Sequence, residues 1–203
     1  MTVKVDAKKL GSANEGSVVF AEVATTSINY EDVNENNTTV TGVTVTGNDI
    51  YLYTIVPTIA LDSKSVTKPA GNTYTFTIKY KATAGGSDIW IKGGSSDAYL
   101  SINTTGGTTT GATISYPKVS ATNATKVTIG SDEYWKILED QTAVVTLKVT
   151  IATASSTNVG YYTVSVSGIT WNATGSANNN VTLTTDWAIK DLKIIDEYLG
   201  YES

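Results

Sequence analysis

The side chains that carry out most enzymatic and metal chemistry are missing from this chain of 203 residues. It has no Cys and no His, and because all 14 of its cationic side chains are Lys, it has no Arg. The chain therefore offers no thiolate nucleophile, no Ser-His-Asp triad, no imidazole or thiolate metal site and no guanidinium clamp for phosphate. We expect a protein that is not an enzyme and has no catalytic, cofactor-binding or assigned metal-binding residue.

Carboxylates are the main reactive groups that remain. Glu139 and Asp140 are adjacent, and adjacent residues on a strand point to opposite faces, which does not suit paired acid–base catalysis. Three acidic loops, 31–36, 95–97 and 131–133, offer the oxygen ligands that Ca²⁺ prefers, but none has the spacing of an EF-hand loop. The favoured interpretation is solvated turns, and no cofactor is expected. A structural calcium ion is the one possibility left open.

Aromatic side chains could form a platform for sugars. Trp90, Trp171 and Trp187 alternate in phase with apolar neighbours, which favours places in the core. Trp135 is the exception, because it follows the polar and acidic residues 131–133.

Six Asn-x-Ser/Thr sequons are candidate glycosylation sites if the host secretes and glycosylates the protein. They begin at Asn36, Asn37, Asn103, Asn123, Asn172 and Asn180. Because 35 of the 203 residues are Thr, composition alone generates several of them.

The composition favours an all-β globular protein. Thr and Tyr are abundant and suit a pleated surface, while charged residues make up 16% and Met occurs once. The net charge of −5 and pI near 4.7 argue against nucleic acid as a partner.

No apolar run reaches the length of a membrane helix, so no membrane span is expected. The first residues lack the apolar region of a signal peptide. If such a peptide has been removed, we expect an extracellular or cell-surface protein.

Alternation of apolar and polar residues with a period of two predicts the β-strands that must position the candidate side chains. It is clearest over 73–80, 142–151 and 162–167, and strands recur about every 8–12 residues with turn signals between them. This pattern is typical of an antiparallel β-sandwich, immunoglobulin-like or jelly-roll. We expect residues 1–48 to be an N-terminal extension with short strands and residues 49–203 to be the sandwich domain.

Four segments give less regular signals. Residues 49–56 are apolar on both faces and predict a central strand, or one covered by another element, that breaks at Pro57. Residues 93–111 are glycine-rich and predict a loop. The phase slips near Gly168, which predicts a β-bulge. A last strand is expected over 181–189. The segment 188–199 either continues that strand or forms a short helical turn, and it is the one place where helix is allowed.

From about residue 58 to 185 the pattern resembles the immunoglobulin-like sandwich domains of prokaryotic surface proteins. The resemblance is carried by four stretches: Thr73–Ile78, Gly85–Ile91, Tyr134–Ala143 and Gly160–Val166. The Cys-free, Thr/Tyr/Gly/Asn-rich composition is also similar to subunits of extracellular prokaryotic filaments. That resemblance implies assembly in which an extended terminal segment of one subunit completes the sheet of the next.

Two functions follow as hypotheses. The first is a structural subunit of an extracellular filament or surface layer, with the protein itself as partner and Val3 and Val5 as the apolar face of a donated strand. Residues 187–195 are the second choice of donor. The alternative is a monomeric adhesive or carbohydrate-binding module that recognises surface glycans. A further alternative for the N-terminal strand is that it pairs within its own domain.

Overall fold

The protein is all-β in the part of the chain that the structure describes. This computed structural model describes residues 17–19, 22–24, 28–31, 37–40, 44–46, 50–52, 55–184 and 189–202. The helical elements among these residues are 3₁₀ turns of three residues, such as η3 (Ser96–Ala98), and no described helix could cross a membrane. The chain divides into two units, Met1–Thr54 and Ile55–Ser203.

The first unit contains six short strands that pair as a nested set. The pairs are β1 (Ser17–Val19) with β6 (Ile50–Leu52), β2 (Glu22–Ala24) with β5 (Thr44–Thr46), and β3 (Ile28–Glu31) with β4 (Asn37–Val40). All three pairs are antiparallel, and the register runs from Ser17 opposite Leu52 to Glu31 opposite Asn37 with a shift of one residue. The six strands therefore follow the course of one long hairpin.

This hairpin changes where the apolar segment 49–56 belongs. The sequence predicted a central strand of the sandwich there, but Ile50–Leu52 pairs with Ser17–Val19 in the first unit. The prediction of its location was wrong because a run that is apolar on both faces does not specify which partner it has. The division between units falls after Thr54, six residues beyond the boundary expected from composition.

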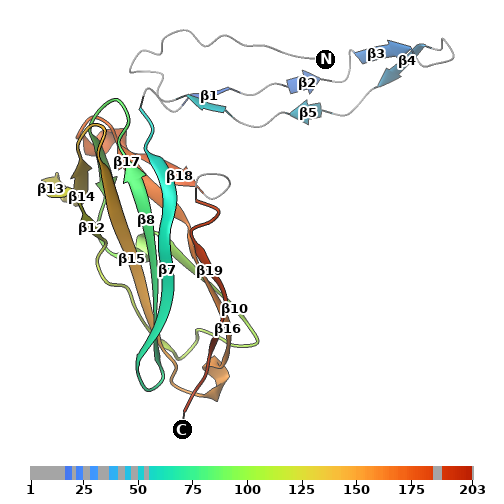
Figure 1. Ribbon diagram of the computed structural model, residues 1–203. Helices are drawn as coiled ribbons and strands as arrows, with labels where there is room; N and C mark the ends of the chain where they lie inside the picture. Colours follow the sequence, from blue (N-terminus) through green and yellow to red (C-terminus); the bar gives the residue numbers. More distant parts are fainter. Residues whose placement is uncertain are drawn as a thin grey trace. The chain divides into compact units, whose positions relative to one another are not determined.

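One sheet of the second unit is built on three long strands. Its order is β11-β15-β8-β7, with β12 also paired to β15. The bounds are β7 (Thr58–Ala70), β8 (Thr73–Thr83), β11 (Thr113–Ser115), β12 (Ser120–Thr122) and β15 (Thr142–Ala152). Figure 1 shows β7, β8 and β15 side by side along this unit.

Two further antiparallel sheets face the same core. One has the order β13-β14-β9-β17-β18 and the other β10-β16-β19. The bounds are β9 (Ile89–Lys92), β10 (Leu100–Thr105), β13 (Thr125–Ile129), β14 (Asp132–Ile137), β16 (Gly160–Val166), β17 (Gly168–Asn172), β18 (Val181–Thr184) and β19 (Lys193–Leu199). The predicted antiparallel, sandwich-like all-β fold is confirmed.

The core follows the alternation seen in the sequence. The buried side chains of β8 include Phe76 and Ile78, and those of β15 include Leu147 and Val149. The other two sheets contribute side chains that are fully or almost fully buried: Ile89, Ile91, Tyr134, Ile137, Tyr162, Val164 and Trp171. Packing of these opposed apolar faces is the main source of stability in such a fold.

The phase slip at Gly168 has a cause other than the predicted bulge. Strand β16 ends at Val166 and β17 begins at Gly168, and the two strands belong to different sheets. Between them, the N–H of Ser167 donates a hydrogen bond to the carbonyl of Tyr99 at 2.8 Å. The chain therefore changes sheets at this point, and the buried face changes with it.

One other segment differs from the sequence predictions. The predicted loop 93–111 contains strand β10, whose polar residues and glycine-rich flanks hide the alternation. For the segment 188–199 strand and helical turn were both expected as alternatives, and the described residues from Lys193 onward form strand β19. In the last predicted strand, β18 ends at Thr184, and residues 185–188 lie outside the described part.

Candidate functional site

Some of the expected donor residues lie outside the described part of the chain. These are Val3, Val5 and Trp187. Of the second-choice donor 187–195, residues 193–195 belong to β19, which pairs with β16 of its own domain. The structure therefore describes surfaces that could accept a strand, and the donor residues Val3 and Val5 stay a prediction from the sequence.

The acidic loops hold carboxylates that are paired with lysines. Asp132 lies 2.7 Å from the Nζ of Lys92, and Glu133 accepts from Lys126 at 2.8 Å and from Lys118 at 3.1 Å. The hydrogen bonds from Lys126 and then Lys118 lower the pKa of Glu133. Of the other two loops, Asp97 is exposed in η3, and residues 32–36 lie outside the described part. The described residues contain no group of three side chains placed to hold a metal ion.

Glu139 and Asp140 lie in an exposed turn rather than on a strand. Asp140 has a φ of 59°, and the N–H of Gln141 donates to the carbonyl of Leu138 at 3.0 Å. The backbone N–H of Glu139 donates to Asp88 at 2.9 Å. These contacts place the two carboxylates in the exposed turn that follows β14.

The sequons divide by the accessibility of the amide nitrogen that would carry a glycan. Asn103 on β10 and Asn123 in a turn are exposed. Asn172 is fully buried, and its Nδ2 donates to Asn180 at 3.1 Å. The Nδ2 of half-buried Asn180 donates to the hydroxyl of Tyr134 at 2.9 Å. Asn36 lies outside the described residues, and Asn37 belongs to β4.

The tryptophans are not a surface platform in the described part of the chain. Trp171 is fully buried, whereas Trp90 and Trp135 are half-buried. The Nζ of Lys136 lies 5.3 Å from the ring centre of Trp90, a cation–π contact that partly covers it. The predicted position in the core is confirmed for Trp171. Trp90 is less deeply buried than the sequence predicted.

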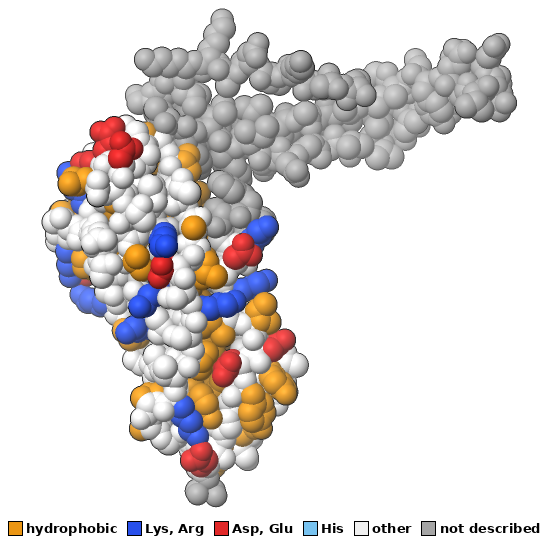
Figure 2. All heavy atoms as spheres, viewed as in Figure 1, with side chains coloured by type: hydrophobic (Ala, Val, Ile, Leu, Met, Phe, Trp, Pro, Cys, Tyr) orange, Lys and Arg blue, Asp and Glu red, His pale blue; other side chains and the backbone are white. Residues whose placement is uncertain are grey.

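Tyrosines form the exposed aromatic pair that the sequence did not single out. Tyr161 on β16 lies opposite Tyr198 on β19, with ring centres 5.3 Å apart and ring planes at 61°. Both are about half exposed, and so is Ile195. The available signal was that Tyr161 falls on the face opposite buried Tyr162. Figure 2 shows hydrophobic side chains exposed between polar groups over the lower part of this unit.

Among the described strands, β7 is the longest of those at the edge of a sheet. It is 13 residues long, and its one partner among the described strands is β8. Nearly every residue along it is exposed. An edge strand presents unpaired backbone N–H and C=O groups, so it can pair with another strand unless something prevents it.

The register with β8 tells which β7 side chains point toward the core. Ile59 and Leu61 lie opposite Ala82 and Tyr80, both of which are buried, so they share the inner face. After an irregularity at Asp62, the residue opposite buried Ile78 is a lysine, Lys64. The inner face of β7 is therefore apolar before this bulge, whereas after it the face carries Lys64 and then Val66, which lies opposite buried Phe76.

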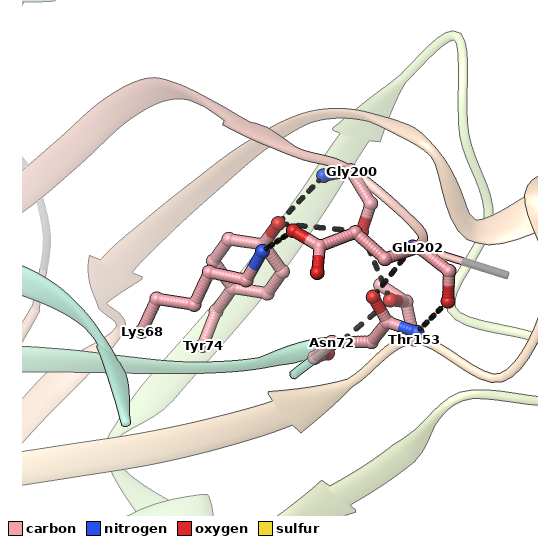
Figure 3. A network of polar contacts seen from close by, with 6 residues as sticks. All are labelled: Lys68, Asn72, Tyr74, Thr153, Gly200 and Glu202. Carbon is pink, nitrogen blue, oxygen red and sulfur yellow. Dashed lines mark hydrogen bonds and ion pairs between the residues drawn. The ribbon is translucent and has the colours of Figure 1, made fainter. Parts of the chain in front are cut away.

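The C-terminal half of β7 is fastened to the end of the chain, as Figure 3 shows. Asn72 makes a two-way contact with Glu202, accepting from its backbone N–H and donating to its carbonyl at 2.8 Å. Lys68 forms an ion pair with the Glu202 carboxylate, which raises the pKa of Lys68. The backbone N–H of Gly200 donates to the hydroxyl of Tyr74 at 2.9 Å. We call these residues, Lys68, Asn72, Tyr74, Gly200 and Glu202, the C-terminal clasp.

The N-terminal half of β7 borders a groove of about 460 Å³. Its lining consists of Val56, Pro57, Thr58, Ile59, Ala60, Leu61, Asp191 and Leu192. Ile59 is half-buried and Leu61 is 37% exposed, although both belong to the inner face.

Comparisons of the chain with protein-family models, with curated proteins and with solved structures found no match.

Proposed function

We propose that this protein is a structural subunit of an extracellular filament or surface layer and assembles by donating a β-strand from one subunit to the next. The observation that carries the proposal is β7, a 13-residue edge strand with exposed side chains. Backbone groups on such an edge give affinity for an added strand, and alternate side chains give specificity.

The N-terminal sequence supports the donor half of this proposal. Val3 and Val5 alternate with Thr2, Lys4 and Asp6, which is the pattern of a strand with one apolar face. The resemblance of the sandwich segment to domains of prokaryotic surface proteins points in the same direction.

Negative-stain electron microscopy of the purified protein, with and without residues 2–10, tests the proposal. The intact chain is expected to form fibres or sheets, and the truncated chain is expected to remain folded and monomeric. Circular dichroism and a thermal melt establish that the truncated chain is folded. Strictly monomeric intact protein at high concentration would exclude self-assembly, and unchanged fibres from the truncated chain would exclude donation from this terminus.

A monomeric adhesive or carbohydrate-binding module is the second candidate, and the exposed pair Tyr161 and Tyr198 favours it. Aromatic rings that are half exposed can stack on the apolar faces of sugars. Glycan-array binding that is lost in the Tyr161→Ala/Tyr198→Ala double variant, by a protein that stays monomeric, would select this function over the first.

A further inference from the structure

We infer that Thr58–Leu61, the N-terminal half of β7, is the acceptor edge to which residues 2–6 of a second copy of this chain add as a strand. The inference rests on the proposed function and adds the place and the register at which one subunit would receive the next. Two differences between the halves of β7 and two properties of the N-terminus carry it.

The first difference is the chemistry of the inner face. Ile59 and Leu61 point to the core side, and Leu61 remains 37% exposed there. Beyond Asp62 the same face carries Lys64 ahead of Val66, and the Nζ of Lys64 donates to the carbonyl of Lys193 at 3.1 Å. Charged residues that point inward and bulges are the devices by which edge strands avoid pairing. The C-terminal half has both, and Thr58–Leu61 has neither.

The second difference is the space beside each half. The last residues of β7 lie beside the C-terminal clasp, in which Lys68 of β7 and Asn72 of the following turn hold Glu202. The N-terminal half borders the groove of about 460 Å³, with Leu192 and exposed Asp191 on its far side. An added strand therefore has room beside Thr58–Leu61, whereas the clasp occupies the corresponding space further along.

The spacing of apolar residues is the first reason to identify residues 2–6 as the strand that occupies this edge. Val3 and Val5 are two residues apart, as are Ile59 and Leu61, so in either strand direction both valines can lie on the inner face beside these residues. The alternating segment 2–6 is five residues long and Thr58–Leu61 is four. The short apolar donor thus matches the length of the unprotected edge.

Charge provides the second reason for a copy of this chain as the occupant. Residues 1–10 contain three lysines, Lys4, Lys8 and Lys9, against one acid, Asp6, for a formal charge of +2. Since the whole chain has a formal charge of −5, residues 11–203 have −7. Asp191 places part of this negative charge in the groove lining. The basic segment of one copy is therefore attracted to the acidic body of another.

Disulfide trapping tests this register directly, because the native chain has no Cys. A chain carrying Val5→Cys, and separately one carrying Val3→Cys, is mixed with a chain carrying Leu61→Cys under mild oxidation. One of the two pairs is expected to form a covalent heterodimer within the fibres, since neighbouring strands bring Cβ atoms to disulfide distance. The matched control is Leu138→Cys, which is 56% exposed in the turn after β14.

A second measurement does not depend on disulfide geometry. Leu61→Lys places a charge on the unprotected inner face, and Leu138→Lys makes the same change on the exposed turn. Leu61→Lys is expected to raise the concentration needed for assembly by about tenfold or more, while Leu138→Lys leaves it unchanged. Thermal melts of the two variants measure whether either one loses folded structure.

The outcomes separate this inference from the function on which it rests. Fibres of the native chain together with an equal response of the Leu61 and Leu138 variants would overturn the acceptor site and leave strand donation standing. A disulfide within one chain, formed by the Val5→Cys/Leu61→Cys double variant as a monomer, would overturn the second copy as occupant. Native protein that never assembles would overturn both.

Discussion

Strands β7 and β8 are neighbours in one sheet, yet they differ in almost every property that a sequence pattern can show. β8 alternates buried and half-exposed side chains with few exceptions, whereas nearly every residue of β7 is exposed. β8 has a partner on each side, β15 and β7, while β7 has β8 alone. Alternation in a sequence marks a strand whose one face is buried and whose other face is in contact with solvent. β7 does not show it, because even the residues of its inner face are exposed or only half-buried.

The largest expected effect comes from removing a core side chain from β8. Phe76 is 1% exposed, so Phe76→Ala should lower the free energy of unfolding by about 3–5 kcal/mol. Thr67→Ala on exposed β7 should change it by no more than about 0.5 kcal/mol. Urea denaturation followed by fluorescence measures both. Equal losses of unfolding free energy would show that the side chains of the two strands are buried to the same extent, and would contradict the difference between β7 and β8.

A smaller effect is expected at the C-terminal clasp, where the two strands meet the end of the chain. Asn72→Ala removes the two hydrogen bonds to Glu202 and should cost about 1–2 kcal/mol of unfolding free energy. Limited proteolysis should then cleave the C-terminal residues faster than in the native protein. Thr157→Ala, in a 3₁₀ turn outside the clasp, serves as the control, and equal cleavage of both variants would contradict this role.

Acid should weaken the charged sheet around β14 before it affects β7 and β8. Hydrogen bonds from Lys126 and then Lys118 lower the pKa of Glu133 from its ordinary 4.5, and those from Lys136 and the Glu139 backbone lower that of Asp88 from 3.8. These ionised groups stabilise the fold above their ordinary pKa values, and that contribution is lost as the pH falls through the lowered ones.

Denaturation curves measured from pH 6 down to pH 2 test this dependence. Stability should begin to fall below about pH 4.5, and the fall should be shallower in Glu133→Gln. A variant with the same acid profile as the native protein would show that the lysine pairs contribute nothing to the pH dependence.

The smallest expected change in stability concerns the inner face of β7. Lys64→Leu should alter the free energy of unfolding by less than about 0.5 kcal/mol, because Lys64 is exposed. It should nevertheless increase association, since the charge that blocks this half of the edge is gone. Analytical ultracentrifugation measures association, and no change would show that Lys64 does not protect the edge.

The strongest elements were predictable from the sequence, and the weaker ones were not. The alternation of 73–80 and 142–151 corresponds to β8 and β15, because their buried faces select apolar residues at every second position. Strand β10 was missed, and β7 was not identified, because neither shows clear alternation. The segment Ile50–Leu52 was assigned to the wrong unit, since an apolar run does not specify its partner.

The candidate site shows the same limit. The alternation of Val3 and Val5, on which the proposed donor rests, can be seen in the sequence because it depends on neighbouring residues alone. The proposed acceptor edge cannot, because Ile59, Leu61 and Lys64 acquire their inner-face positions from the register with β8. The exposed pair of Tyr161 and Tyr198 likewise depends on the alignment of two strands far apart in the chain.

The sequence by itself determined the all-β class, the lack of Cys, His and Arg chemistry, and the alternating strands of the core. These follow from side-chain type and local period, which need no partner to be identified. Only the tertiary structure decided which strand is left at the edge, where the bulge at Asp62 divides it, and which sequon asparagines are buried. Those properties depend on which distant segments pair, because pairing determines the backbone groups that remain free and the faces that remain uncovered.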